Sequence, residues 1–321
     1  MYKNKNVLLI AGGGTLGTYT AKELLKLGCN VDIICPEEKV SHDERLTFYQ
    51  SLATEELLKD LFSKKHYHGI VNFIHYKKPD DYKLVHHLLA ENTDHLIFLS
   101  SYRVYADMEH PITENSPRLL DVSTDERFLA EEDYAVSKAK AEDYIRAQEP
   151  KNWTFVRPVI SFSQRRLDIV TTSRRIVLES AREGKTIYLP EIAKNITAGL
   201  DWSGNTGKII ANLLFKKEAF GEAFTISSAP NLTWGEVAEL YTQLLGTKFE
   251  WVDTEKWMAN PDYPKTHPCM WAEKYDRFFD RAVDTSKVMK VTGLKPEDFL
   301  SIKEGLIIEI GKILEEMHGG M

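Results

Sequence analysis

Two stretches of this sequence carry side chains that could move a proton together. Tyr134 and Lys138 stand four residues apart, so on a helix they share one face and set a phenol beside an ammonium group. A serine pair, Ser100-Ser101, precedes them by about thirty residues. A phenol near a cation can accept a proton and return it, and a neighbouring hydroxyl can orient the reacting group. The pattern therefore predicts acid–base chemistry.

A glycine run near the N-terminus could supply a phosphate cradle for that chemistry. Residues 12–17 read Gly-Gly-Gly-Thr-Leu-Gly and fit the pattern G-x-G-x-x-G. An apolar run at 7–11 precedes them, and apolar residues at helical spacing follow over 18–27. In this context the first glycine permits a tight turn, the second lets the backbone approach a pyrophosphate, and the third allows close helix packing. The run therefore predicts a dinucleotide-binding turn.

The elements that must position these residues alternate along the first half of the chain. We expect strands at 7–11, 31–35, 69–74, 95–100 and 153–158, and helices at 18–27, 55–62, 80–92 and 133–148. Repeated strand–helix units predict an α/β fold, with a Rossmann-type, doubly wound parallel sheet and a smaller C-terminal substrate lobe. Residues 1–160 form the expected dinucleotide-binding domain, to which strands near 197–228 return. Residues 161–321 form mainly the lobe, where helices are expected at 173–183, 233–245 and 301–317.

The composition argues against several classes of partner and site. The chain has 321 residues, 43% hydrophobic and 28% charged, with a net charge of −7. The acidic balance argues against a nucleic-acid partner. The three cysteines have no paired spacing, the histidines lack further ligands at metal spacing, and no apolar run reaches membrane length. We therefore expect a cytoplasmic protein without a metal site or a membrane partner.

The end of the second expected strand bears on the choice of cofactor. Cys35 ends that strand, and Glu37 and Glu38 follow shortly after it. A carboxylate there can bind the ribose 2′-hydroxyl of NAD and repels the extra phosphate of NADP. The nearest basic residues are Lys39 and Arg45. The sequence favours NAD and leaves NADP as the alternative.

These features together resemble a known family. The glycine turn, the segment 98–105 with its serine pair, the Tyr134…Lys138 pair and the segment 155–158 resemble an extended short-chain dehydrogenase/reductase. More narrowly, they are similar to the NAD-dependent epimerase/dehydratase family, which acts largely on nucleotide sugars. The end of the strand expected at 69–74, with the residues 72–76, is more like the atypical, reductase-leaning branch.

The resemblance implies roles for particular residues. Tyr134 would be the acid/base, Lys138 would bind the nicotinamide ribose and favour the phenolate, and Ser101 would orient the substrate oxygen. An ordinary tyrosine has a pKa of ~10, so a base near neutrality needs about 4 kcal/mol of differential stabilisation. The residues expected to bind the cofactor are Gly12, Gly14, Thr15, Leu16, Gly17, Cys35, Glu37, Phe73, His75, Tyr134, Lys138 and Pro158.

The expected function is that of an NAD(P)-dependent epimerase/dehydratase acting on a nucleotide sugar, with hydride transfer at a Ser-Tyr-Lys site. One alternative is an NADP-dependent reductase or dehydrogenase of a non-sugar substrate. Another is a non-catalytic member that binds a dinucleotide or RNA. The resemblance also implies a homodimer that pairs through helices flanking the sheet.

Overall fold

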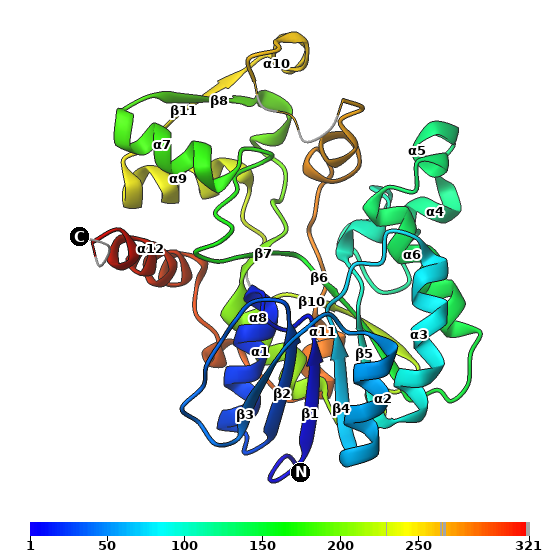
Figure 1. The fold of residues 1–321 in the computed structure, drawn as a ribbon. Helices are drawn as coiled ribbons and strands as arrows, with labels where there is room; N and C mark the ends of the chain where they lie inside the picture. Colours follow the sequence, from blue (N-terminus) through cyan, green and yellow to red (C-terminus); the bar gives the residue numbers. More distant parts are fainter. Residues whose placement is uncertain (229, 264, 266–267, 319–321) are drawn as a thin grey trace.

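Seven parallel strands form the central sheet of the protein, in the order β10-β6-β5-β4-β1-β2-β3 (Figure 1). The computed structural model describes residues 1–228, 230–263, 265 and 268–318. The strands are β1 Asn6–Ile10, β2 Asn30–Cys35, β3 Leu46–Gln50, β4 Tyr67–Asn72, β5 Thr93–Leu99, β6 Trp153–Pro158 and β10 Glu222–Ile226. The strand order reverses between β1 and β4, which is where ligands bind in sheets of this kind. The predicted Rossmann-type α/β fold is confirmed.

The strands carry apolar side chains on both faces of the sheet, which explains why helices cover both faces. In β1, Val7 and Leu9 pack into one core and Leu8 and Ile10 into the other. Such a continuous apolar strand is stable only when helices cover both faces. The first face carries α1 Thr15–Lys26, α8 Ser203–Leu213 and α11 Ser286–Thr292. The second carries α2 Glu55–Lys64, α3 Pro79–Glu91 and α6 Tyr134–Arg146.

Helices α1 and α8 pack closely because of one glycine. A Cβ on Gly207 of α8 would lie 2.8 Å from the backbone nitrogen of Thr20 in α1. A larger residue at position 207 would therefore push α8 away from the helix that follows the glycine turn.

A second layer lies above the carboxyl end of the sheet (Figure 1). It contains α7 Arg174–Glu183, β8 Thr186–Pro190, α9 Trp234–Leu245, β11 Lys248–Val252 and α10 Thr254–Ala259, with β8 and β11 paired in parallel. The short parallel pair β7 Ile160–Phe162 and β9 Leu200–Trp202 lies between this layer and the sheet. Helix α12 Ile302–His318 buries Ile302, Leu306 and Ile310 in the same core as α7 and α9.

Shorter elements complete the described chain. They are α4 Leu119–Val122, α5 Glu126–Ala130, the 3-10 turns η1 Tyr102–Val104, η2 Glu191–Ala193, η3 Lys217–Ala219 and η5 Pro296–Asp298, and the π-helix η4 Glu273–Arg277. Within the described ranges, every helix is too short or too polar to span a bilayer. The same residues contain no cluster of three or more side chains suited to hold a metal ion.

Candidate active site

The glycine turn joins the end of β1 to the start of α1. Ala11 takes a φ of 55°, and Gly14 caps the helix in an extended conformation. A Cβ on Gly17 would lie 2.6 Å from the carbonyl carbon of Gly12, so only glycine lets α1 start so close to the turn. A Cβ on Gly14, by contrast, would meet no protein atom within 4 Å. The backbone at Gly14 is therefore open to a bound group.

The beginning of α1 is suited to hold an anion. Gly14 provides no side chain to cap the first turn. The first N–H groups of a helix have no partner within the helix and carry the positive end of its dipole. Thr15 forms an Oγ–Oγ hydrogen bond of 3.0 Å with Ser163, which ties this turn to the segment after β7. The turn fits the diphosphate of a dinucleotide.

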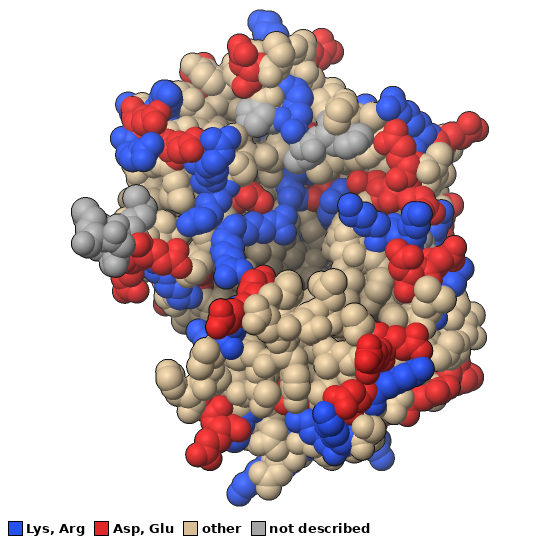
Figure 2. Space-filling view, in the orientation of Figure 1, with Lys and Arg blue, Asp and Glu red and all other residues tan. Residues whose placement is uncertain are grey.

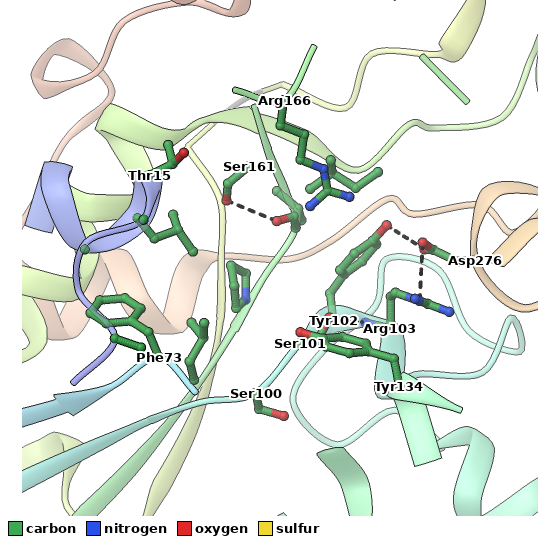
Figure 3. Close-up of a pocket in the computed structure, with 18 of the residues that line it drawn as sticks. Thr15, Phe73, Ser100, Ser101, Tyr102, Arg103, Tyr134, Ser161, Arg166 and Asp276 are labelled. Carbon is green, nitrogen blue, oxygen red and sulfur yellow. Dashed lines mark hydrogen bonds and ion pairs between the residues drawn. The ribbon is translucent and has the colours of Figure 1, made fainter. Parts of the chain in front are cut away.

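A cavity of about 470 Å³ lies at the carboxyl ends of the central strands (Figure 3). Figure 2 shows it as a hollow in the middle of one face, with Lys and Arg side chains gathered along one rim. Its wall brings together many of the predicted site residues, namely Gly14, Thr15, Leu16, Gly17, Phe73, Ser101, Tyr134 and Pro158. The predicted residues Gly12, Cys35, Glu37, His75 and Lys138 are not among those that line it.

Ser101 and Tyr134 lie side by side in the cavity wall (Figure 3). Tyr134 is the first residue of α6, which Asp133 caps through its side chain. Ser101 caps the turn η1 and accepts a 3.2 Å hydrogen bond from the backbone N–H of Arg103. Burial raises the pKa of Tyr134, while the charge of Arg103 and the hydroxyl of Ser101 oppose that rise.

Lys138 lies behind the Tyr134 ring in the protein interior. Its Nζ is 5.8 Å from the ring centroid and donates hydrogen bonds to the carbonyls of Ile74 (3.2 Å) and Leu99 (2.5 Å). The side chain is only 2% exposed. Burial lowers the pKa of Lys138 to about 7, and nearby Glu142 opposes the shift. The ammonium is thus held by backbone carbonyls next to the cavity.

His75 stands edge-on to the same ring, with centroids 4.6 Å apart. Its Nε2 is 3.2 Å from the hydroxyl oxygen of Ser137. Partial burial and the nearby charge of Lys138 lower the pKa of His75, so its imidazole is neutral at pH 7. His75 therefore packs against Tyr134 without adding a positive charge.

The residues after β2 lie against the glycine turn. A Cβ on Gly13 would lie 2.5 Å from the Cβ of Cys35 and 2.8 Å from Oε2 of Glu37. The Glu37 carboxylate is thus close to the turn, as a ligand for a ribose hydroxyl would need to be. Lys39 donates a 2.5 Å hydrogen bond to the carbonyl of Gly13. A second cavity of about 250 Å³ adjoins the turn, and its basic lining residues are Lys22, Lys39, Arg165 and Lys312.

A charged cluster that the sequence analysis missed closes the other end of the main cavity. Asp276 accepts a 2.5 Å hydrogen bond from the hydroxyl of Tyr102 and pairs with Arg277. Its carboxylate also lies 3.5 Å from Nε of Arg103. Burial alone would raise the pKa of Asp276, but Arg277 and Arg103 outweigh it and hold that pKa below its usual value. Tyr102, Arg103, Asp276 and Arg277 all line the cavity, and so does Arg166.

A buried carboxylate supports the floor of the site. Glu142 accepts a 2.5 Å hydrogen bond from the hydroxyl of Ser100 and forms a 2.5 Å ion pair with Arg157. The side chains of Glu142 and Arg157 are 0% and 1% exposed. Ser100 and Ser101 both line the cavity, but the hydroxyl of Ser100 is engaged by Glu142 on α6.

Comparison with known proteins identifies the family. A model of the NAD dependent epimerase/dehydratase family matches residues 8–202, which is more than half of the chain. The chain belongs to this family. Membership confirms the prediction of an NAD-dependent enzyme of the epimerase/dehydratase type with NAD as its cofactor. No curated protein sequence matches the chain.

Solved structures of low sequence identity share the fold of this family member. An epimerase from Methanothermobacter thermautotrophicus is 17% identical, with a TM-score of 0.70 over 99% of this chain and 94% of its own. A UDP-glucose 4-epimerase from Thermotoga maritima is 16% identical, with a TM-score of 0.69 over 97% and 99%. A UDP-glucuronic acid 4-epimerase from Bacillus cereus is 15% identical, with a TM-score of 0.68 over 97% and 99%.

Proposed function

We propose that this enzyme acts on a nucleotide-linked sugar and uses Ser101, Tyr134 and Lys138 for hydride transfer from a carbon that bears a hydroxyl. The observation that carries the proposal is that Ser101 and Tyr134 line the same cavity as the first residues of α1. A cofactor on the glycine turn and a hydroxyl facing Tyr134 would then share one space of about 470 Å³.

The residues of the turn fit NAD. The open backbone at Gly14 and the first N–H groups of α1 would hold the diphosphate, and Glu37 would accept a ribose hydroxyl. When bound, NAD supplies the hydride acceptor. Phe73 and Pro158 line the cavity and would exclude water from its inner wall.

The chain's own residues would handle the proton. In its ionised form, Tyr134 would take the substrate hydroxyl proton on its phenolate oxygen and later return it. Ser101 would fix that hydroxyl by a hydrogen bond, because its own oxygen lies beside Tyr134 in the cavity wall. Lys138 completes the set behind the ring, where the family resemblance assigns it to the nicotinamide ribose.

The far end of the cavity suits an anionic substrate. Arg166 and Arg277 line it, and guanidinium groups bind diphosphates through paired hydrogen bonds. Solved relatives of this fold hold UDP-glucose, in the Thermotoga maritima enzyme, and UDP-glucuronic acid with NAD, in the Bacillus cereus enzyme. We therefore assign the nucleotide diphosphate of the substrate to this end.

Turnover of defined nucleotide sugars tests the proposal. The purified chain is incubated with NAD and either UDP-glucose or UDP-glucuronic acid, and the products are separated by chromatography. Tyr134→Phe should reduce turnover about 100-fold or more, because it removes the acid/base, while NAD affinity measured by calorimetry stays unchanged. Tyr144→Phe is the matched control, since Tyr144 lies on the same helix, contacts His87 and does not line the cavity. Retained turnover by Tyr134→Phe would refute the assignment.

One observation favours a second candidate, an NADP-dependent reductase of a non-sugar substrate. The basic residues around the second cavity, including Lys39 and Lys22, adjoin the glycine turn and could receive a 2′-phosphate. Calorimetry with NAD and NADP separates the candidates. Tighter binding of NADP, together with no turnover of either nucleotide sugar, would favour the reductase.

The proposed enzyme is a homodimer that pairs through helices on one face of the sheet. This part of the proposal rests on the family resemblance, in which dimers through helices that flank the sheet are common, and α3 is one of those helices. Light scattering that gives the mass of one chain would contradict this part of the proposal.

A further inference from the structure

Arg103 lies over the ring of the proposed acid/base. Its guanidinium carbon is 5.3 Å from the centroid of Tyr134, and both residues line the main cavity. Nη2 of Arg103 binds Oδ1 of Asp133 at 3.1 Å. Because Asp133 caps the helix that begins with Tyr134, this ion pair fixes the guanidinium to the same helix end as the phenol.

Lys138 is engaged differently. Its ammonium lies at a similar distance from the ring centroid, 5.8 Å, but donates to the carbonyls of Ile74 and Leu99 and does not line the cavity. Burial lowers the pKa of Lys138 to about 7, so its charge depends on pH near neutrality. A guanidinium keeps its charge at every pH at which the protein is folded.

Other charged or titratable groups surround Tyr134. They are Asp133 at the helix cap, Lys138 on α6, His75 after β4, Arg166 after β7 and Asp276 in η4. The carboxylates of Asp133 and Asp276 disfavour a phenolate. Arg103 pairs with the first at 3.1 Å and lies 3.5 Å from the second. The single positive charge of Arg103 therefore offsets part of the negative charge that these two carboxylates place beside the phenol.

We propose that Arg103 is a positioning residue that supports the ionised form of Tyr134, a part that the family pattern gives to the lysine alone. The inference rests on the proposed function, in which Tyr134 is the acid/base. Arg103 acts through Tyr134 by holding a fixed charge above its ring while substrate occupies the cavity.

A direct titration of residue 134 tests the proposal without a substrate. Trifluorotyrosine, whose phenol is more acidic than that of tyrosine, is incorporated in place of Tyr134, and its ¹⁹F resonance is followed against pH in the full chain with NAD. Arg103→Gln should raise the pKa of residue 134 by about 1 unit or more, and Arg103→Lys should raise it less. Arg175→Gln is the matched control, because Arg175 is an exposed arginine paired with Glu179 on α7, and it should leave that pKa unchanged.

Arg103→Met provides a second neutral replacement should Arg103→Gln fail to fold. It should raise the pKa of residue 134 by about 1 unit or more, as Arg103→Gln does. A shift below about 0.5 unit in a folded Arg103→Gln or Arg103→Met chain would overturn the role of Arg103. That result would leave the proposed function standing, since that is decided by the turnover of Tyr134→Phe.

Discussion

Replacing Gly17 by alanine should separate α1 from the glycine turn. The new Cβ would lie 2.6 Å from the carbonyl carbon of Gly12 and still closer to its carbonyl oxygen and Cα. These atoms belong to the backbone, so no rotamer change can relieve the contact. Overpacking costs about 1–3 kcal/mol, and the rigid neighbours here place the expected loss near 3 kcal/mol. The melting temperature should fall by roughly 4 °C.

Gly14→Ala is the matched control for this substitution. Its Cβ would meet no protein atom within 4 Å, and its φ of −74° suits alanine. The stability should change by less than about 1 kcal/mol, the usual effect of exchanging residues at a helix N-cap. The methyl group would nevertheless occupy the open space before α1, so the affinity for NAD should fall about tenfold or more, which is ~1.4 kcal/mol.

Thermal melts without ligand and calorimetry with NAD measure both effects. Gly17→Ala should mainly lower the melting temperature, and Gly14→Ala should mainly weaken the binding of NAD. If Gly14→Ala binds NAD as tightly as the wild type, the turn is not where the diphosphate rests. If Gly17→Ala is as stable as Gly14→Ala, the steric reasoning about the turn is wrong.

Two further predictions concern buried carboxylates. Glu142→Gln should lower the free energy of unfolding by about 3–5 kcal/mol, because it leaves Arg157 buried without a counter-charge. A loss below about 1 kcal/mol, measured by urea unfolding, would contradict this prediction. Burial raises the pKa of Asp201 to about 6, so the folded chain binds that proton more tightly than the unfolded chain does. The stability should therefore fall by roughly 3 kcal/mol in all as the pH rises from well below about 4 to well above about 6. Asp201→Asn should lack this pH dependence. Urea unfolding of the wild type and of Asp201→Asn at several pH values tests the prediction.

The sheet could be predicted from the sequence because its strands are continuous apolar runs. In β1, the neighbouring residues Leu8 and Leu9 pack into opposite cores. A strand that is buried on both faces in this way appears in the sequence as a continuous apolar run. Helix α8 was not expected. Its sequence begins Ser-Gly-Asn-Thr-Gly, which is poor in helix-forming residues, and it is stabilised by close packing on α1 at Gly207. Tertiary contact here overrides local propensity.

The candidate site could be predicted only where its residues belong to a motif with recognisable spacing. Ser101 and Tyr134 carry recognisable spacing, and both line the cavity. Arg166 and Asp276 come from irregular segments, where no periodicity indicates which side chains turn inward. Arg103 carries one signal in the sequence: it is the only charged residue of the segment 98–105.

The hydrogen bond between Tyr102 and Asp276 joins residues 174 positions apart. During translation, Tyr102 and Arg103 are synthesised long before Asp276, the carboxylate with which both of them interact. Until that partner emerges, the guanidinium of Arg103 lacks one of the two anions beside it. Asp276 and Arg277 also line the main cavity, so the wall of that cavity is complete only after translation has passed residue 277.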